Sequence, residues 1–224
     1  MELRMKHVME LLKVPEKEVL RRIKEKQLPA RKLNHQYVFN EQEIREWAVK
    51  NGVEMNSRLV RGTAPGAHVS AASLMQKGGF IYGLKGRTVG ELLGDAVTRM
   101  RLPDNLKKQD VLDSLLERED MMPTAVGSGI AIPHPRKPLI TEVKNESITV
   151  CLLSHPINYS APDKKPVHTM FIVLSANHAR HLHILAGLLY LCQQEPFTAL
   201  LSSNSAAADI MKAAFEIEDK VKGE

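Results

Sequence analysis

The sequence has few cysteines and aromatic residues and no long apolar run. Its 224 residues include two cysteines, and aromatic residues make up 4% of the chain. Cys151 and Cys192 lie far apart in apolar segments, so they form no zinc or redox motif and are expected to be buried free thiols. No segment approaches the roughly 18 apolar residues of a membrane span, and the N-terminal MELRMKHVMELLKV lacks the apolar core of a signal peptide. We therefore expect a cytoplasmic globular protein without a membrane segment.

Most of the sequence also lacks excess charge of either sign. Residues 1–50 contain 12 Lys and Arg against 8 Asp and Glu, a net charge of +4, and residues 51–73 add +1. Residues 74–224 contain 17 of each, a net charge of zero. This distribution favours a polyanion-binding module followed by a neutral globular domain.

Three regions are predicted along the chain. Residues 1–52 form a small helix-rich domain, in which Asn34-His35 makes a turn between two short strands and a helix over Glu41 to Val49 buries Ile44 and Trp47. Residues 53–73 are rich in Gly, Ala and Ser and indicate a flexible linker. Residues 74–224 form the main domain.

The main domain alternates helix and strand signals. TVGELLGDAVTRM, KKQDVLDSLLERED, ARHLHILAGLLYLCQQ and SAAADIMKAAFEIE have the composition and spacing of helices, whereas GIAIP, SITVCLLS and HTMFIVLSA are typical of buried strands. Strands that alternate with helices predict an α/β fold, in which helices cover both faces of a sheet.

The N-terminal region resembles a winged helix-turn-helix of the excisionase or MerR-like kind, in VMELLKVPEKEVLRRIKEKQLPA, QYVF and EIREW. The resemblance implies that a helix from about Pro15 to Lys26 enters the DNA major groove. The basic residues of that helix are Lys17, Arg21, Arg22, Lys24 and Lys26; those on or near the wing are Arg31, Lys32 and His35. Two alternatives stay open: a charged face that is merely solvated, and a module that binds protein instead of DNA.

One histidine stands in a stiff setting, in GIAIPHPR. Pro133 and Pro135 restrict the backbone on both sides of His134. An imidazole is a neutral-pH nucleophile that can carry a phosphoryl group, and guanidinium groups such as those of Arg118 and Arg136 suit phosphate oxygens. This combination favours phosphoryl transfer.

The segment LLEREDMMPTAVGSGIAIPHPR resembles the active-site region of phosphotransferase-system EIIA domains of the fructose–mannitol class, which includes the nitrogen-regulatory EIIA proteins. The resemblance extends over APDKKPVHTMFIVLSANHARHLHILAGLL and covers residues 74–224. The resemblance implies a three-layer α/β/α domain with a mixed sheet. It also implies that His134 is phosphorylated by phospho-HPr or its nitrogen-pathway relative. By the same resemblance, His181 helps to hold the phosphoryl group and Arg118 steadies the site. Arg136 is added on spacing and charge alone. The family often has a small residue where Pro135 stands.

Cofactor and metal sites are not expected. His178, His181 and His183 have no Cys, Asp or Glu at ligand spacing, GGFIYGLK departs from a P-loop, and Ser128 lacks the flanking pattern of a nucleophile elbow.

The sequence thus predicts a regulatory EIIA-type phosphocarrier joined to a DNA-binding module, and dimerisation would supply two DNA half-sites. An EIIB domain or a regulatory protein would be its target. The alternatives are a regulator that uses the EIIA fold only as a sensor, and a sugar-transport EIIA component whose N-terminal module docks a protein.

Overall fold

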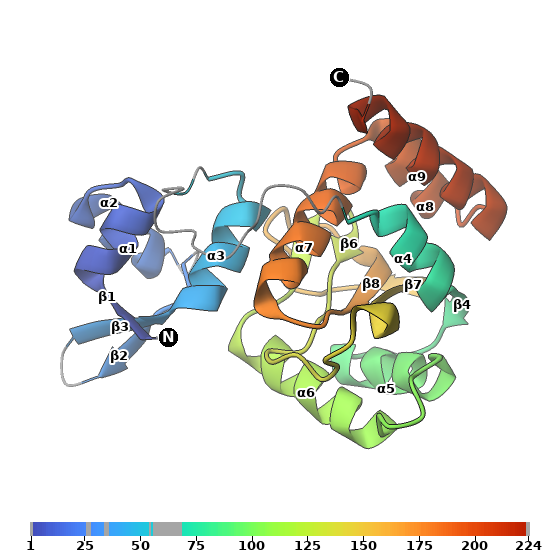
Figure 1. Cartoon of the computed structure of the whole chain (residues 1–224), viewed down its shortest axis with the longest axis horizontal. Helices are drawn as coiled ribbons and strands as arrows, with labels where there is room; N and C mark the ends of the chain where they lie inside the picture. The colour runs from blue at the N-terminus through green and yellow to red at the C-terminus, as the bar shows by residue number, and fades with distance from the viewer. Residues whose placement is uncertain (1, 26–27, 34–35, 54, 56–68, 223–224) are drawn as a thin grey trace. The chain divides into compact units, whose positions relative to one another are not determined.

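The computed structural model describes residues 2–25, 28–33, 36–53, 55 and 69–222 (Figure 1). The chain forms two compact units, Met1–His68 and Val69–Glu224, and each is considered by itself. The predicted turn at Asn34-His35 and most of the predicted linker (residues 54 and 56–68) lie outside the described residues.

The N-terminal unit combines three helices with a small antiparallel sheet in the described part of its chain. Its elements are β1 (Glu2–Arg4), α1 (Met5–Leu12), α2 (Glu16–Lys24), β2 (Arg31–Leu33), β3 (Gln36–Asn40) and α3 (Glu41–Lys50). The strands pair in the order β1-β3-β2. The predicted helix over Glu41 to Val49 is confirmed as α3, and Ile44 and Trp47 belong to the core of this unit. The Asn40 side chain begins that helix by accepting hydrogen bonds from the Gln42 and Glu43 amides.

The second unit is an α/β domain with a mixed sheet, as predicted. Its helices are α4 (Ala71–Gly78), α5 (Val89–Arg99), α6 (Lys108–Met121), α7 (His178–Cys192), α8 (Glu195–Ser202) and α9 (Ala207–Lys222), with a 3₁₀ turn at Val143–Asn145. Its strands are β4 (Phe80–Leu84), β5 (Ala125–Gly127), β6 (Ile130–Ala131), β7 (Ser147–Ile157) and β8 (Val167–Leu174). The strand order is β4-β7-β8-β6-β5; β4 runs parallel to β7 and β6 parallel to β8, whereas the β7–β8 and β5–β6 pairs are antiparallel.

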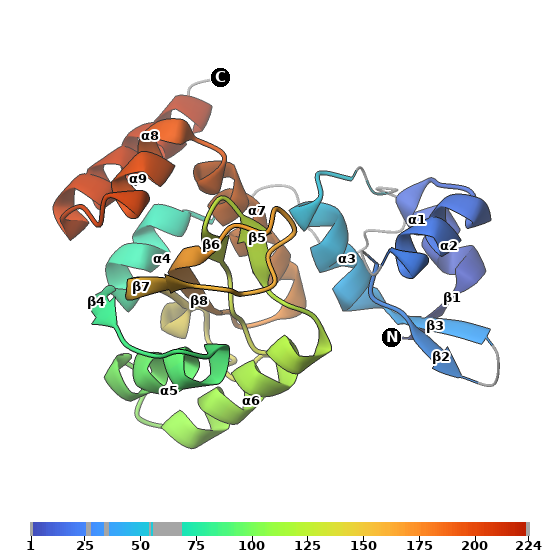
Figure 2. The same cartoon turned by 180° about the vertical axis from the view of Figure 1, so that it is seen from behind.

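Helices cover both faces of this sheet. Along β8, Met170, Ile172 and Leu174 belong to the apolar cluster shared with α5 and α6. The alternate residue Phe171 contacts Phe197 of α8 on the other face, with ring centroids 6.3 Å apart. Figures 1 and 2 show α5 and α6 on one side of the sheet and α4 and α7 on the other. The domain is therefore a three-layer α/β/α unit.

Helix α4 begins inside the segment that the sequence analysis assigned to the linker. Ser70 caps the helix, and the buried Glu218 carboxylate of α9 accepts hydrogen bonds from the Ser70 hydroxyl and the Ala72 amide. Ala71 and Ala72 are fully buried, so the small residues that suggested a linker instead allow close helix packing.

The strand directions separate two ends of the sheet. The carboxyl ends of β6 and β8 lie at one end, because these strands are parallel. The carboxyl ends of β4 and β7 lie at the opposite end, because β7 is antiparallel to β8. Each end carries a different group of polar side chains, described below.

Among the residues that the structure describes, no single helix is long and apolar enough to cross a membrane. The bent pair α7 and α8 meets the length and composition criteria only when the two helices are taken together, across a bend of 83°.

Candidate functional site

His134 follows β6 at the carboxyl end of that strand. The Pro133 carbonyl accepts a hydrogen bond from the Val173 amide of β8, which continues the pairing of the two segments as far as the histidine. The His134 Nδ1 atom lies 2.8 Å from the Ile132 carbonyl oxygen. A carbonyl oxygen can only accept, so Nδ1 carries a proton and the lone pair of the neutral ring lies on Nε2. If His134 acts as a nucleophile, as the sequence predicts, this tautomer presents Nε2 for the reaction.

His181 comes from the first turn of α7 and meets His134 at the same end of the sheet. The two ring centroids are 4.6 Å apart, and the ring planes are inclined at 50°. Asn177 begins α7 by accepting a hydrogen bond from the Arg180 amide, and the His181 amide donates to the Asn177 carbonyl. His181 Nδ1 lies 3.3 Å from the Ser175 hydroxyl. The structure therefore brings together the two histidines that the sequence analysis selected.

A buried ion pair fixes the turn that carries His181. Glu146, which has no exposed surface, accepts hydrogen bonds from the Ala176 amide (3.0 Å) and from Arg180 Nε (2.8 Å) and Nη2 (2.6 Å). The hydrogen bond with Glu146 raises the pKa of Arg180. Ala176 and Arg180 lie on either side of the Asn177 cap, so one carboxylate holds both ends of the β8–α7 turn. We name Glu146 and Arg180 the turn brace.

The turn brace was missed from the sequence. Arg180 adjoins His181, but Glu146 lies 34 positions away from Arg180 and no local motif links them. The antiparallel register that pairs Ser147 with Leu174 would have indicated that Glu146 lies beside the turn, had that register been known.

The two predicted arginines make contacts with α6 and the residue that follows it. Arg118 lies in the last turn of α6, and its Nη1 donates to the Met122 carbonyl at 2.9 Å. Arg136 Nη1 lies 3.9 Å from Glu117 Oε1 of the same helix. Both interactions join α6 to neighbouring backbone or loop, and the role of each arginine toward a phosphoryl group stays a prediction.

Glu119, the neighbour of Arg118, holds the connection between α6 and β5. Its carboxylate accepts hydrogen bonds from the Thr124 amide (2.8 Å), the Thr124 hydroxyl (2.6 Å) and the Tyr159 hydroxyl (3.2 Å). Burial raises the pKa of Glu119 despite these hydrogen bonds. Glu119 is thus a structural carboxyl group that the sequence analysis did not single out.

The glycine-rich turn before His134 is a two-residue hairpin between β5 and β6. Ser128 and Gly129 have φ angles of 52° and 73°, as a type I′ turn requires. The Ser128 amide donates to Asp163 Oδ2 at 2.8 Å, and a Cβ atom on Gly129 would collide with the His168 ring. The space beside Gly129 is therefore filled by the His168 ring of the same domain. His168 packs against the turn, and burial lowers its pKa.

In the N-terminal unit, two of the predicted DNA-contacting arginines are engaged within the unit. Arg21 pairs with Glu18 at 2.7 Å and with Glu25 at 3.0 Å, and Arg22 Nε lies 2.6 Å from Glu18. The Arg22 guanidinium also lies over the Trp47 ring, 4.9 Å from its centroid. Hydrogen bonds from Arg21 and Arg22 lower the pKa of Glu18 to about 2.

The other predicted DNA contacts divide into two groups. Lys17 and Lys24 on α2, and Arg31 and Lys32 on β2 of the wing, have exposed side chains. Lys26 and His35 lie outside the described residues.

Comparison with known proteins defines the class of both units. Residues 74–216 match the family "Phosphoenolpyruvate-dependent sugar phosphotransferase system, EIIA 2", and the chain belongs to this family. Residues 2–51 match a helix-turn-helix domain family.

Individual relatives agree with this assignment. The nitrogen regulatory protein of Bradyrhizobium diazoefficiens is 31% identical over 102 residues, which cover 45% of this chain and 65% of the relative. The fructose-specific EIIA component of Haloferax volcanii is 34% identical over 99 residues, or 43% of this chain and 60% of the relative. The match thus spans less than two thirds of the length of either relative. The crystal structure of nitrogen regulatory protein IIA-Ntr from Neisseria meningitidis superposes with a TM-score of 0.52 and 25% identity, over 60% of this chain and 92% of that one.

Proposed function

We propose that this protein is an EIIA-type regulatory phosphocarrier that accepts a phosphoryl group on His134 Nε2 from a phosphohistidine carrier protein, HPr or its nitrogen-pathway relative. The observation that carries the proposal is the contact between the His134 and His181 rings, combined with the hydrogen bond that places the lone pair of His134 on Nε2. Family membership supports it. Because the donor is a cytoplasmic carrier, the proposal places the protein in the cytoplasm.

The transfer requires no water and no added cofactor. The P–N bond of the carrier breaks as a P–N bond forms to His134 Nε2, and the carrier imidazole recovers its lone pair. Positive charge develops on the His134 ring during this step. The Nδ1–H···O=C bond to Ile132 stabilises that charge and keeps the ring in its attacking orientation.

His181 has a distinct role in this proposal. The Ser175 hydroxyl lies 3.3 Å from Nδ1 of His181. In the proposal this hydroxyl donates to Nδ1, which leaves the ring proton of His181 on Nε2. That N–H donates a hydrogen bond to a phosphoryl oxygen on His134. A neutral donor binds the group less tightly than a cation would, which allows the group to pass on to an EIIB domain or a regulatory protein. Arg118 and Arg136 add positive potential near the strand ends.

The test is intact-mass analysis after incubation with phosphoenolpyruvate, the EI kinase and the carrier. Wild type should gain one acid-labile phosphoryl group, and His134→Gln should gain none. His183→Gln, which changes a histidine on the same helix, is the matched control and should be phosphorylated normally. Absence of phosphorylation of wild type with either carrier would contradict the proposal and leave the alternative in which the EIIA fold serves only as a sensor.

A second function, DNA binding by the N-terminal unit, is supported by its helix-turn-helix family match and by the exposed Lys17, Lys24, Arg31 and Lys32. The α2 helix would enter the major groove, and the β2–β3 wing would contact phosphates. Duplex binding by the full chain should weaken steeply with salt, and Lys17→Gln/Lys24→Gln should reduce the salt slope by about 2. Absent or salt-independent binding would contradict this function and favour a module that docks a protein, as a sugar-transport EIIA component would use.

A further inference from the structure

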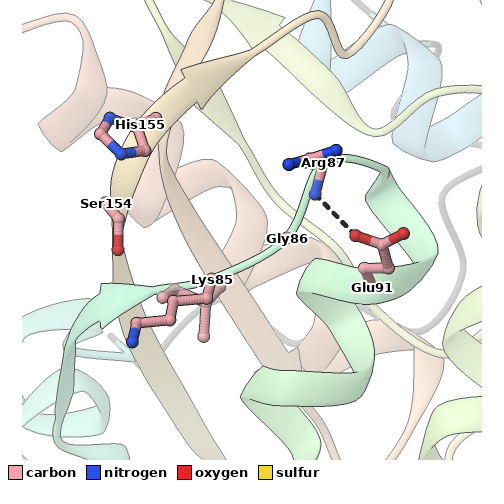
Figure 3. Close-up of a pocket in the computed structure, with 7 residues that line it drawn as sticks. Lys85, Gly86, Arg87, Glu91, Ser154 and His155 are labelled. Carbon is pink, nitrogen blue, oxygen red and sulfur yellow. Dashed lines mark hydrogen bonds between the residues drawn. The ribbon is translucent and has the colours of Figure 1, made fainter.

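A cavity of about 790 Å³ lies at the end of the sheet opposite the histidine pair. The loop Lys85–Arg87 between β4 and α5 forms one wall, and Ser154 and His155 near the end of β7 form another. Figure 3 shows these side chains around the cavity, with Glu91 on the first turn of α5. The carboxyl ends of β4 and β7 point away from the end that carries His134, so the cavity is separate from the candidate phosphoacceptor site.

The cavity wall carries basic groups from two different elements. Lys85 and Arg87 come from the loop, and His155 comes from β7. Within the described parts of the chain, the ammonium group of Lys85, the guanidinium group of Arg87 and the imidazole of His155 make no hydrogen bond or ion pair. By contrast, Arg180 and Arg22 each bind a carboxylate of the chain.

Nearby carboxylates are used to shape the loop. Asp95 accepts a hydrogen bond from the Lys85 amide at 3.0 Å, and Glu91 accepts one from the Arg87 amide at 2.8 Å (Figure 3). Asp95 also lies 3.4 Å from Arg99. These acids therefore bind main-chain N–H groups, and the basic side chains of the same loop extend from a fixed backbone.

A glycine brings this loop close to α5. A Cβ atom on Gly86 would lie 2.8 Å from the Leu92 amide nitrogen, so residue 86 must lack a side chain. On the opposite wall, a Cβ atom on Gly83 would lie 3.7 Å from Ser154 Oγ. Because residue 83 has no side chain, it does not cover the serine hydroxyl. Gly86 thus packs the loop directly against α5, which fixes the backbone from which Lys85 and Arg87 extend.

We propose that this cavity binds a small phosphorylated metabolite. Lys85 and Arg87 would contact the phosphate oxygens, because ammonium and guanidinium groups are the side chains best suited to phosphate. Ser154 would donate its hydroxyl hydrogen, and His155 would contact the organic part. The volume exceeds what a bare phosphate needs and lies within the range of roughly 300–1,000 Å³ typical of small-molecule sites. The site is independent of the chemistry at His134 and would make the domain responsive to a metabolite as well as to a carrier protein.

The test is titration of the full chain with inorganic phosphate, ribose 5-phosphate, ribose and citrate, followed by amide chemical shifts and calorimetry. Ribose 5-phosphate should give saturable shifts in the amides of Lys85–Arg87 and Ser154–His155, with weaker binding of phosphate and none of ribose. Citrate separates phosphate recognition from general polyanion binding, and equal affinity for citrate would overturn the assignment of a phosphorylated ligand.

Variants locate the binding. Lys85→Gln/Arg87→Gln should weaken ribose 5-phosphate binding about tenfold or more, because two charge-assisted contacts are removed. Lys77→Gln/Arg101→Gln removes the same charge from exposed positions elsewhere in the domain and should leave binding unchanged. An equal loss in both variants, or no saturable shift at millimolar ligand, would overturn the proposal. Phosphorylation of His134 is measured separately, so failure of the two proposals can be told apart.

Discussion

The two units use their charged residues in contrasting ways. In the N-terminal unit, Arg21 of α2 pairs with Glu18 three residues before it and with Glu25, the residue that ends the helix, four residues after it. In the EIIA domain, Glu146 and Arg180 pair across 34 positions, and the carboxylate has no exposed surface. The first arrangement follows from helix spacing and the second from tertiary folding.

The two kinds of ion pair differ in the free energy that is lost when one partner is removed. An exposed pair on a helix contributes at most about 0.5 kcal/mol, and its partners remain available to other ligands. A buried pair costs several kcal/mol to break, because removing one partner leaves an uncompensated charge. In the EIIA domain the buried pair holds the turn that carries His181, whereas the pairs on α2 lie at the surface of the N-terminal unit.

Breaking the turn brace should have the largest effect. Glu146→Gln leaves Arg180 partly buried without its carboxylate and should lower the free energy of unfolding by about 3 kcal/mol, measured by urea denaturation. The β8–α7 turn should also loosen, so phosphorylation of His134 should slow at temperatures where the variant is folded. The matched control is Glu142→Gln, which removes an exposed pair with Lys144 and should leave stability nearly unchanged. An equal loss of unfolding free energy in the two variants would contradict the difference between the buried and the exposed pair.

The second prediction compares the stability lost when alanine replaces Gly129, in the turn before His134, and Gly52 of the N-terminal unit. Gly129 and Gly52 have φ angles of 73° and 62°, so alanine is strained at both. Gly52→Ala adds a methyl group into open space and should cost about 1 kcal/mol, whereas Gly129→Ala also collides with the His168 ring and should cost about 2–3 kcal/mol. Thermal unfolding measures both. If adding His168→Ala to Gly129→Ala recovered no stability, the collision would not be the cause.

The buried carboxyl group of Glu119 should make the stability of the EIIA domain depend on pH. Because burial raises its pKa in the folded state above the ordinary value of 4.5, ionisation opposes folding. The stability that Glu119 contributes is therefore fully present below about pH 4.5 and is lost as the pH rises through its folded pKa. Glu119→Gln should lose less stability than wild type as the pH rises through this window in urea denaturation. A parallel pH dependence of the two proteins would contradict the assignment.

The smallest stability effect is expected on α2. Glu18→Gln removes the shared partner of Arg21 and Arg22 and should leave the stability of the unit nearly unchanged, because solvent screens these pairs. The same change should strengthen DNA binding and make the salt slope steeper by about 1–2, because one or two more cations meet phosphates. Fluorescence anisotropy across a salt series measures this. Weaker binding by the variant would contradict the view that these arginines can be recruited.

Local patterns predicted most helices of both units. Apolar spacing located α5, α6 and α7 within a residue or two, and the apolar run SITVCLLS located the start of β7 at Ser147. Small residues misled the interpretation, because Ala71 and Ala72 serve close packing in α4. In the same way, GGFIYGLK was considered only as a nucleotide loop, although it contains the strand β4.

For the candidate site, a motif predicted the important histidines, whereas their supports depended on tertiary contacts. His134 and His181 were both selected, and the structure places their rings in contact. The turn brace and the packing of His168 on Gly129 join residues 34 and 39 positions apart, and strand register alone brings them together. No periodicity of the sequence carries that information.

The central claim is that the backbone selects Nε2 of His134 as the phosphoryl acceptor. The most direct measurement is a long-range proton–nitrogen correlation spectrum of the phosphorylated, ¹⁵N-histidine-labelled protein, with phosphorus coupling read at each ring nitrogen. We expect phosphorus coupling at Nε2 of His134 and a proton retained on Nδ1. Coupling at Nδ1 of His134, or at either nitrogen of His181, would contradict it.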